Sequence, residues 1–343
     1  MSNMTNQEII DEIKSRLTTD VEENKKYLKE QLQKYRSEKN GQVAFAVTQL
    51  LFSYLTKEER AKYDKIAFEI IQFRKNQFQE SNKLIKEGKL EEAKRIILNL
   101  VQSYEKLERV RDKIYFDFEQ LMEYIIYCKT VKRSQQLDIH RYPEPIAYFY
   151  YQLGCIEVEQ EDTLEAITYF TKALKYNPRG LYLYEELVKL YLKQEDYDKA
   201  FSLSKEALEY AYKKEQFAFF YKALGMCYKV MQKYDISIAS FVVSDHFAGE
   251  AFNKNEIAEI IKVAGYIKFE KPEDILQLFA KEQINYGPSR QLIETVNDFI
   301  SYFKFTKNYP SLEYVLKVMV ELTDSDYYQK QLKELEDLKN EKK

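Results

Sequence analysis

The chain has 343 residues and a formal net charge of −3 from 53 basic and 56 acidic side chains, so it offers no concentrated positive surface for a nucleic acid. It contains only 8 glycines and 6 prolines, which turn-rich β architectures use heavily, so the composition favours helices joined by short links. There is no run of about 18 apolar residues, and the polar N-terminus lacks the apolar core of a signal peptide, so we expect neither a membrane span nor secretion.

Residues 1–73 are predicted to form a small helical bundle. Three threonines stand three residues before a glutamate, a spacing at which the hydroxyl caps the third amide of a helix while the carboxylate reaches back. The pairs are Thr5 with Glu8, Thr19 with Glu22, and Thr56 with Glu59. They predict helices near 5–17, 20–38 and 57–87, and Gly41 precedes a further apolar helix. No basic recognition helix occurs in residues 1–70, so direct DNA binding is not expected.

Residues 74–145 are predicted to hold a degenerate helical repeat and a proline-containing connection. Residues 82–101 indicate two helices around a tight turn at Gly88. Apolar residues at three- and four-residue steps predict that the chain stays helical over 104–130. Prolines then flank a stretch without periodicity, residues 131–146, which we interpret as either a subdomain boundary or a functional loop.

From residue 147 the sequence repeats itself. Small residues recur 34 positions apart between the first two copies, and 37 positions apart between the next two because three residues are inserted near 209–217. The recurring sets are Gly154, Val188 and Gly225; Ala166, Ala200 and Ser237; and Ala173, Ala207 and Ser244. A period of this length is typical of stacked helix pairs, in which one pair alone cannot bury its apolar face.

These copies resemble the tetratricopeptide repeat, which places aromatic residues, small residues and a final proline at fixed spacing. The first copy matches with Tyr150, Leu153, Gly154, Ala166, Phe170, Ala173 and Pro178, the second with Tyr184, Leu187, Tyr191, Ala200 and Ala207, and the third with Tyr221, Leu224, Gly225, Tyr228 and Phe241. The departures are Glu157 for a tyrosine, Val188 for the glycine and Ser204 for the large aromatic residue. The resemblance implies an all-α fold, a right-handed superhelical array of antiparallel helix pairs with three units over 146–248, beside the N-terminal helical bundle.

Residues 249–343 are predicted to form degenerate helical repeats that end in a charged capping helix. Three prolines stand where helix starts would place them. The helices are expected near 254–268, 272–284, 289–306, 310–322 and 325–340.

The resemblance also implies that the first helix of each pair lines a concave surface. A second set of helically spaced side chains on these helices points away from the packing residues and defines a candidate binding surface, called the stripe below. The stripe consists of Tyr148, Tyr151, Cys155, Tyr182, Glu185, Lys189, Phe219, Lys222, Met226 and Lys229. Its aromatic residues and lysines fit a protein or peptide with apolar anchors and acidic groups. Alternatively, the same rings pack against a neighbouring repeat or a capping helix. The Lys and Asn positions with which some relatives clamp a terminal carboxylate are not matched here.

No catalytic, metal or cofactor motif stands out. The two histidines are His140, in the proline-containing connection, and His246, beside Ser244 and Asp245, whose side chains point in different directions on a helix. Three cysteines without metal-binding spacing, Cys128, Cys155 and Cys227, fit free thiols in a reducing cytoplasm.

We therefore expect a non-catalytic, cytoplasmic scaffold that binds a protein or peptide and needs no cofactor, with self-assembly into a homo-oligomer as a further possibility. The alternative is an intracellular peptide-sensing regulatory receptor without its own DNA-binding domain, by analogy with bacterial regulators that pair a helical module with such repeats.

Overall fold

The computed structural model describes residues 5–38, 40–105, 113–130, 138–141, 144–265, 269 and 271–340. Within these residues the chain forms seventeen helices and one two-stranded sheet. It divides into two compact units, one made of residues 1–115 with 136–142 and the other of residues 116–135 with 143–343. The units are called unit 1 and unit 2 below. The predicted division into four parts stays a prediction.

Unit 1 contains the helical bundle and the helix pair that follows it. Its helices are α1 (Asn6–Ser15), α2 (Val21–Ser37), α3 (Gly41–Tyr54), α4 (Lys57–Lys86) and α5 (Leu90–Glu105). Residues such as Ile13, Leu28 and Val47 bury a common apolar core among the first helices. Helix α4 runs without a break through the expected boundary at residue 73.

Capping explains where these helices begin. Thr5 and Thr56 each form the predicted reciprocal cap with the glutamate three residues later. The predicted cap at Thr19 is wrong, because the Asp20 carboxylate accepts hydrogen bonds from the amides of Glu22 and Glu23. A carboxylate is an equally good helix cap, and it also complements the positive end of the helix dipole.

The prediction of continuous helix over 104–130 is wrong. Residues Lys113–Phe116 form strand β1, which pairs with β2 (Asp138–Arg141), and helix α6 (Leu121–Thr130) begins only afterwards. Ile, Tyr and Phe in β1 are residues that favour strands, and pairing with a segment distant in sequence overrides the local helical pattern. The predicted connection over 131–146 lies largely outside the described residues.

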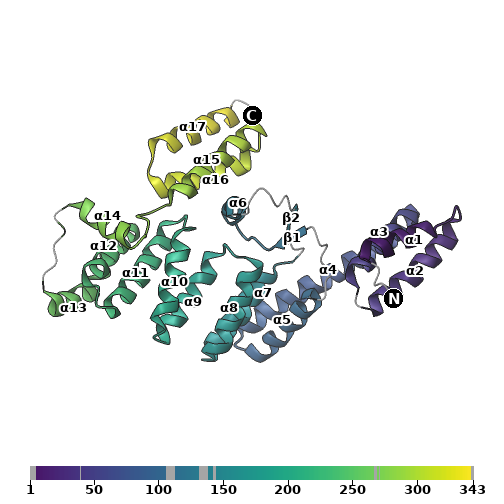
Figure 1. Ribbon diagram of the computed structural model, residues 1–343, viewed down its shortest axis with the longest axis horizontal. Coiled ribbons are helices and arrows are strands. Elements are labelled where there is room, and N and C mark those ends of the chain that lie inside the picture. Colours follow the sequence, from purple (N-terminus) through teal and green to yellow (C-terminus); the bar gives the residue numbers. More distant parts are fainter. Residues whose placement is uncertain are drawn as a thin grey trace. The chain divides into compact units, whose positions relative to one another are not determined.

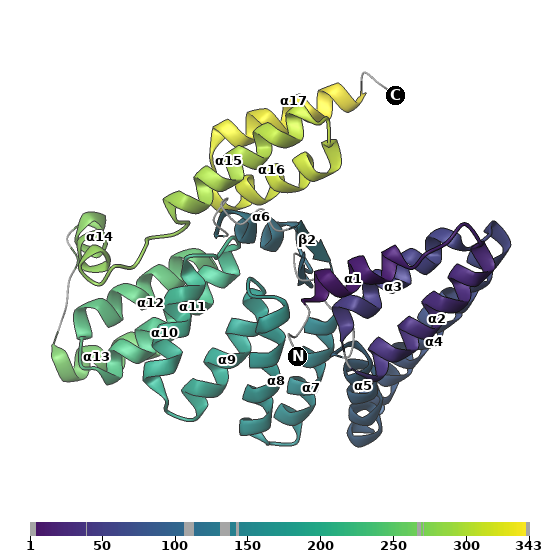
Figure 2. The same cartoon turned by 45° about the vertical axis from the view of Figure 1, so that its right-hand side comes forward.

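Unit 2 is built mainly from three antiparallel helix pairs, stacked in chain order as Figures 1 and 2 show. The pairs are α7 (Ile146–Glu159) with α8 (Thr163–Tyr176), α9 (Leu181–Lys193) with α10 (Tyr197–Leu208), and α11 (Lys214–Val230) with α12 (Tyr234–Ala248). The predicted all-α array of helix pairs is confirmed. The turns within the pairs share one left-handed residue at the same register position, Glu161, Glu195 and Gln232.

Small residues let the helices of a pair approach closely. A Cβ atom on Gly154 would lie 2.5 Å from the ring of Phe170, and one on Gly225 would lie 2.9 Å from the ring of Phe241. In the second pair both partners are exchanged, because Val188 takes the glycine position and Ser204 takes the aromatic position. Both are fully buried, and Ser204 satisfies its hydroxyl by donating to the Ala200 carbonyl at 2.7 Å. The larger side chain of Val188 therefore compensates for the smaller side chain of Ser204 on the facing helix.

The remaining helices of unit 2 also match the predictions closely. They are α13 (Lys254–Ala264), α14 (Pro272–Lys281), α15 (Arg290–Phe305), α16 (Tyr309–Thr323) and α17 (Asp326–Asn340). Helix α6 packs against α15, as Figure 2 shows. The rings of Tyr124 and Phe299 meet edge to face there at 6.4 Å between ring centres. At its other side, Glu123 of α6 accepts a hydrogen bond from Asn177, which follows α8. Helix α6 thus connects the first helix pair with the C-terminal helices.

Candidate functional site

The stripe is formed by the first helices of the three pairs, α7, α9 and α11. Lys189 is exposed, and the other stripe residues are partly buried, whereas the neighbouring packing residues such as Tyr150 and Leu187 are almost fully buried. The two sets of side chains therefore differ in exposure as well as in register. Whether a partner lies on the stripe stays a prediction.

The beginning of the stripe lines a cleft of about 570 Å³ within unit 2. Its tyrosines are in contact, because Tyr148 stacks on Tyr151 at 5.7 Å and Tyr151 meets Tyr182 edge to face at 5.1 Å between ring centres. Tyr151 also contacts Phe170 of the repeat core. Since both α7 and α9 contribute rings, the stacking of the first two pairs creates this surface.

Residues from outside the stripe complete the cleft. Glu119, Gln120 and Glu123 come from α6 and the segment before it. The start of the third pair and the residues before it contribute Tyr212, Lys213, Glu215 and Gln216. The second group belongs to the three-residue insertion near 209–217. Insertions in repeat arrays fall on loops, often on the binding face, so this insertion was the signal in the sequence that could have pointed to the cleft. No sequence signal places α6 there.

The carboxyl of Glu123 is the most buried acidic group of the cleft. Its Oε2 atom accepts hydrogen bonds from the amides of Glu119 and Gln120 at 2.7 and 3.1 Å and from the Asn177 side chain at 2.9 Å. Burial nevertheless raises the pKa of Glu123 to about 7, because the three donors offset only part of the lost hydration. Burial likewise raises the pKa of Glu185, although Lys189 acts in the opposite direction.

The far end of the stripe carries its lysines. Lys189 pairs with Glu186 at 2.8 Å and also lies 5.7 Å from the ring centre of Phe219. Lys222 lies over the ring of Phe252 at 5.1 Å. Lys229 pairs with Glu259 of α13 at 2.5 Å, and Met226 packs against the apolar cluster around Ile260. The third pair therefore uses Lys229 and Met226 of its stripe in contacts around α13.

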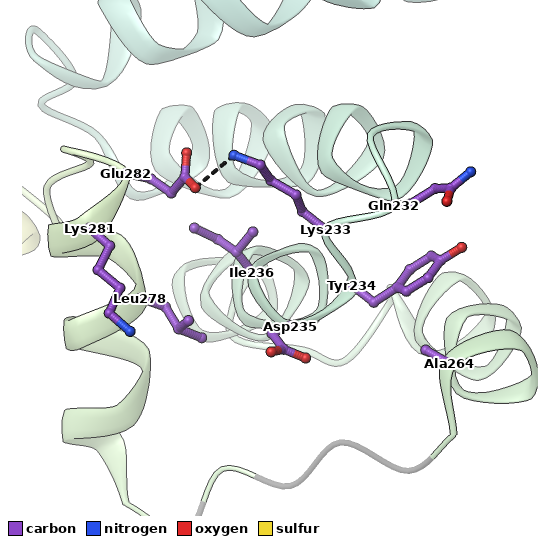
Figure 3. Close-up of a pocket in the computed structure, with 9 residues that line it drawn as sticks. All are labelled: Gln232, Lys233, Tyr234, Asp235, Ile236, Ala264, Leu278, Lys281 and Glu282. Atoms are coloured by element: carbon purple, nitrogen blue, oxygen red, sulfur yellow. Dashed lines mark hydrogen bonds and ion pairs between the residues drawn. The ribbon is translucent and has the colours of Figure 1, made fainter.

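A second cleft of about 520 Å³ lies between α12, α13 and α14, and Figure 3 shows its lining. The ammonium of Lys233 donates to Glu282 at 2.8 Å across it, as Figure 3 shows. Tyr228 also donates to Glu282 at 3.3 Å. No stripe residue lines this cleft. Because Glu282 is already engaged by two partners, we regard the first cleft as the stronger candidate site.

The groups considered for chemistry are engaged in packing. The Ser244 hydroxyl donates to the Ala218 carbonyl at 2.7 Å, and His246 contacts the rings of Phe247 and Tyr286, so Ser244 and His246 do not form a nucleophile–base pair. Burial raises the pKa of Cys155 to about 11, which keeps this thiol protonated. In the part of the chain that the structure describes, no group of three candidate ligands could hold a metal ion.

Comparison with known proteins agrees with the register of the first pair. A model of the tetratricopeptide repeat matches residues 147–179, which comprise nearly all of α7, the whole of α8 and the turn that follows. No curated protein matches the chain. Among the described residues, no helix is both long and apolar enough to cross a membrane. The match, together with the packing of Gly154 against Phe170, shows that residues 147–179 form a tetratricopeptide repeat.

Proposed function

We propose that the chain is a non-catalytic scaffold that binds a peptide segment of a protein partner along the stripe. One observation carries this proposal. Tyr148, Tyr151 and Tyr182, from two neighbouring first helices, line a single open cleft and stay partly exposed there. Aromatic side chains provide a large contact area at a small cost in conformational entropy, which makes them the usual anchors of interfaces. Repeats of this family generally mediate contacts between proteins.

The character of the stripe supports an extended peptide with apolar anchors. Its residues on α7 are aromatic or apolar, and charged residues join them on α9 and α11, so a bound segment would meet both kinds along the stripe. Lys189, Lys222 and Lys229 at the far end favour acidic groups on the ligand. Two of these lysines already pair with glutamates, so a ligand carboxylate would share or replace those partners.

A random peptide library displayed on phage and selected on the full chain would test the proposal. The selected peptide, labelled with a fluorophore, is then titrated with wild type and with Tyr148→Ala, and we expect a loss of affinity of about tenfold or more. Tyr327→Ala is the matched control, because Tyr327 is 61% exposed on α17 and does not line the cleft. Equal affinities for wild type and Tyr148→Ala would refute the proposed surface.

The lysines are tested separately by charge reversal. The triple variant Lys189→Glu, Lys222→Glu, Lys229→Glu should weaken any selected peptide that contains acidic residues, and more strongly at low salt because exposed charges are screened by ions. If the triple variant binds such a peptide as tightly as wild type does, the lysines do not recognise it.

The second candidate function is a peptide-sensing receptor. It is favoured by the separate compactness of unit 1, which a distinct effector module would require. Small-angle scattering of the full chain with and without the selected peptide distinguishes the two candidates. A smaller radius of gyration with peptide supports a receptor that changes conformation, and an unchanged radius supports a static scaffold.

A further inference from the structure

The cleft at the beginning of the stripe has a charge opposite to that of the lysine end. Four carboxylates line it, and Lys213 is the basic residue among the lining side chains. The carboxylates come from three separate places in the chain: Glu119 and Glu123 near α6, Glu185 on α9, and Glu215 on α11. We call this surface the acidic cleft.

One of these carboxylates is buried in a way that leaves an acceptor for a ligand. Glu123 is only 2% exposed, and its Oε2 atom receives three hydrogen bonds. Its Oε1 atom receives none from the residues that the structure describes. This oxygen therefore has acceptor capacity that a hydrogen-bond donor of a ligand could use, and a charged donor would form the stronger bond with it.

Glu185, which also lines the cleft, likewise has unused acceptor capacity. It is partly buried on α9, and among the described residues it forms neither a hydrogen bond nor an ion pair. Two acidic groups from different helices therefore lie at the cleft with unused acceptor capacity. A positively charged donor is the ligand group that would satisfy both of them.

The walls of the cleft are aromatic. Tyr148, Tyr151, Tyr182 and Tyr212 all contribute to its lining. Tyrosine rings attract a cation over their faces, and an arginine guanidinium also stacks on them. Carboxylates beside tyrosine rings thus combine the two interactions by which proteins hold a basic side chain.

We propose that the acidic cleft binds a lysine or arginine side chain of the partner peptide. This inference rests on the proposed function, because it assigns one residue of the peptide expected along the stripe. It also gives the ligand a direction. The basic residue lies at the end formed by α7 and α9, and acidic residues of the ligand lie toward the lysines of α9 and α11.

The test uses three labelled peptides with the sequence of one peptide selected from the library, each differing only at a single position. That position carries arginine, leucine or glutamate. We expect the arginine peptide to bind wild type about tenfold more tightly than the leucine peptide, and the glutamate peptide to bind most weakly. Selection of peptides without basic residues, or equal affinities for the three, would overturn the proposal.

Variants of the full chain test whether the carboxylates of the acidic cleft contact the basic residue of the peptide. Glu185→Gln should reduce the affinity of the arginine peptide about tenfold and leave that of the leucine peptide unchanged. Glu123→Gln should act in the same direction, and Glu185→Gln carries the test if the loss of Glu123 disturbs α6. Glu159→Gln is the matched control, because Glu159 is exposed on α7 outside the cleft, and it should leave both affinities unchanged.

The two proposals fail in different ways. If Glu185→Gln weakens the arginine and leucine peptides equally, the acidic cleft does not recognise the basic residue, although the stripe can still bind peptides. If Tyr148→Ala leaves all three peptides bound as before, the stripe itself is not the binding surface, and the proposed function fails first.

Discussion

The close contact between Gly154 and Phe170 leads to a quantitative prediction. A Cβ atom at residue 154 would lie 2.5, 2.7 and 2.7 Å from three atoms of the Phe170 ring, whereas ordinary contacts begin at 3.4 Å. The ring of Phe170 is fully buried and would have to shift by nearly 1 Å, by the difference of those two distances. Such overpacking costs about 1–3 kcal/mol.

The helix propensity of alanine offsets part of this cost. Replacing glycine by alanine inside a helix gains about 1 kcal/mol, so Gly154→Ala should lower the free energy of unfolding by up to about 2 kcal/mol. Gly225→Ala is the matched comparison, because its Cβ would lie 2.9 Å from Phe241 and needs a smaller shift. We expect Gly225→Ala to lose less stability than Gly154→Ala does.

The second helix pair shows how the contact can be exchanged. Gly154→Val alone should be worse than Gly154→Ala, and Phe170→Ser alone should cost about 3–5 kcal/mol because it opens a cavity. The double variant copies the arrangement of Val188 and Ser204, so its loss should be smaller than the sum of the single losses by at least about 1 kcal/mol.

Urea unfolding followed by far-ultraviolet circular dichroism measures these differences, since the chain has no tryptophan for fluorescence. A Gly154→Ala variant more stable than wild type by about 1 kcal/mol would show that the pair accommodates the extra carbon without strain. Strict additivity in the double variant would show that the two positions do not exchange volume.

Three further predictions concern capping, protonation and thiol reactivity. Asp20→Ala should destabilise unit 1 by about 1 kcal/mol and Thr19→Ala by much less, which thermal melts of the two variants would compare. Because the pKa of Glu123 is raised to about 7 in the folded chain, the folded state binds its proton more tightly than the unfolded state does. The free energy of unfolding should therefore fall by at most about 3 kcal/mol as the pH rises from about 4.5 to about 7, and urea titrations should find this slope absent in Glu123→Gln. Burial raises the pKa of both Cys155 and Cys128, so at pH 7.5 each should react with a maleimide much more slowly than a free thiol does, and mass spectrometry would detect rapid modification if this reasoning is wrong.

The sequence predicted those features that depend on residues close together in the chain. The helix pairs could be found because a small residue and a large one recur at fixed spacing, as in Gly154 with Phe170. Strand β1 could not be found, because its pairing with β2 depends on a segment more than twenty residues away. Thr19 was preferred over Asp20 because a spacing rule does not show which of two adjacent oxygens faces the helix end.

The candidate site also contains residues that the sequence could predict and residues that it could not. The tyrosines of the stripe follow from the repeat register, so their place at the cleft was within reach of the sequence. Glu123 was not, because only the fold brings α6 beside the first helix pair. The acidic character of the cleft could therefore not be predicted from the stripe, of which Glu185 is the one acidic residue.

The double attachment of α6 has a consequence for the way unit 2 comes apart. In a simple array each repeat contacts only its neighbours, so the end repeats can unfold one at a time. Here α6 contacts α15 through Tyr124 and Phe299 and holds Asn177 through Glu123. These contacts link the first helix pair to the C-terminal helices through α6. We therefore expect the helices of unit 2 to unfold together as long as α6 keeps both contacts. When α6 detaches, the helix pairs should unfold independently of one another.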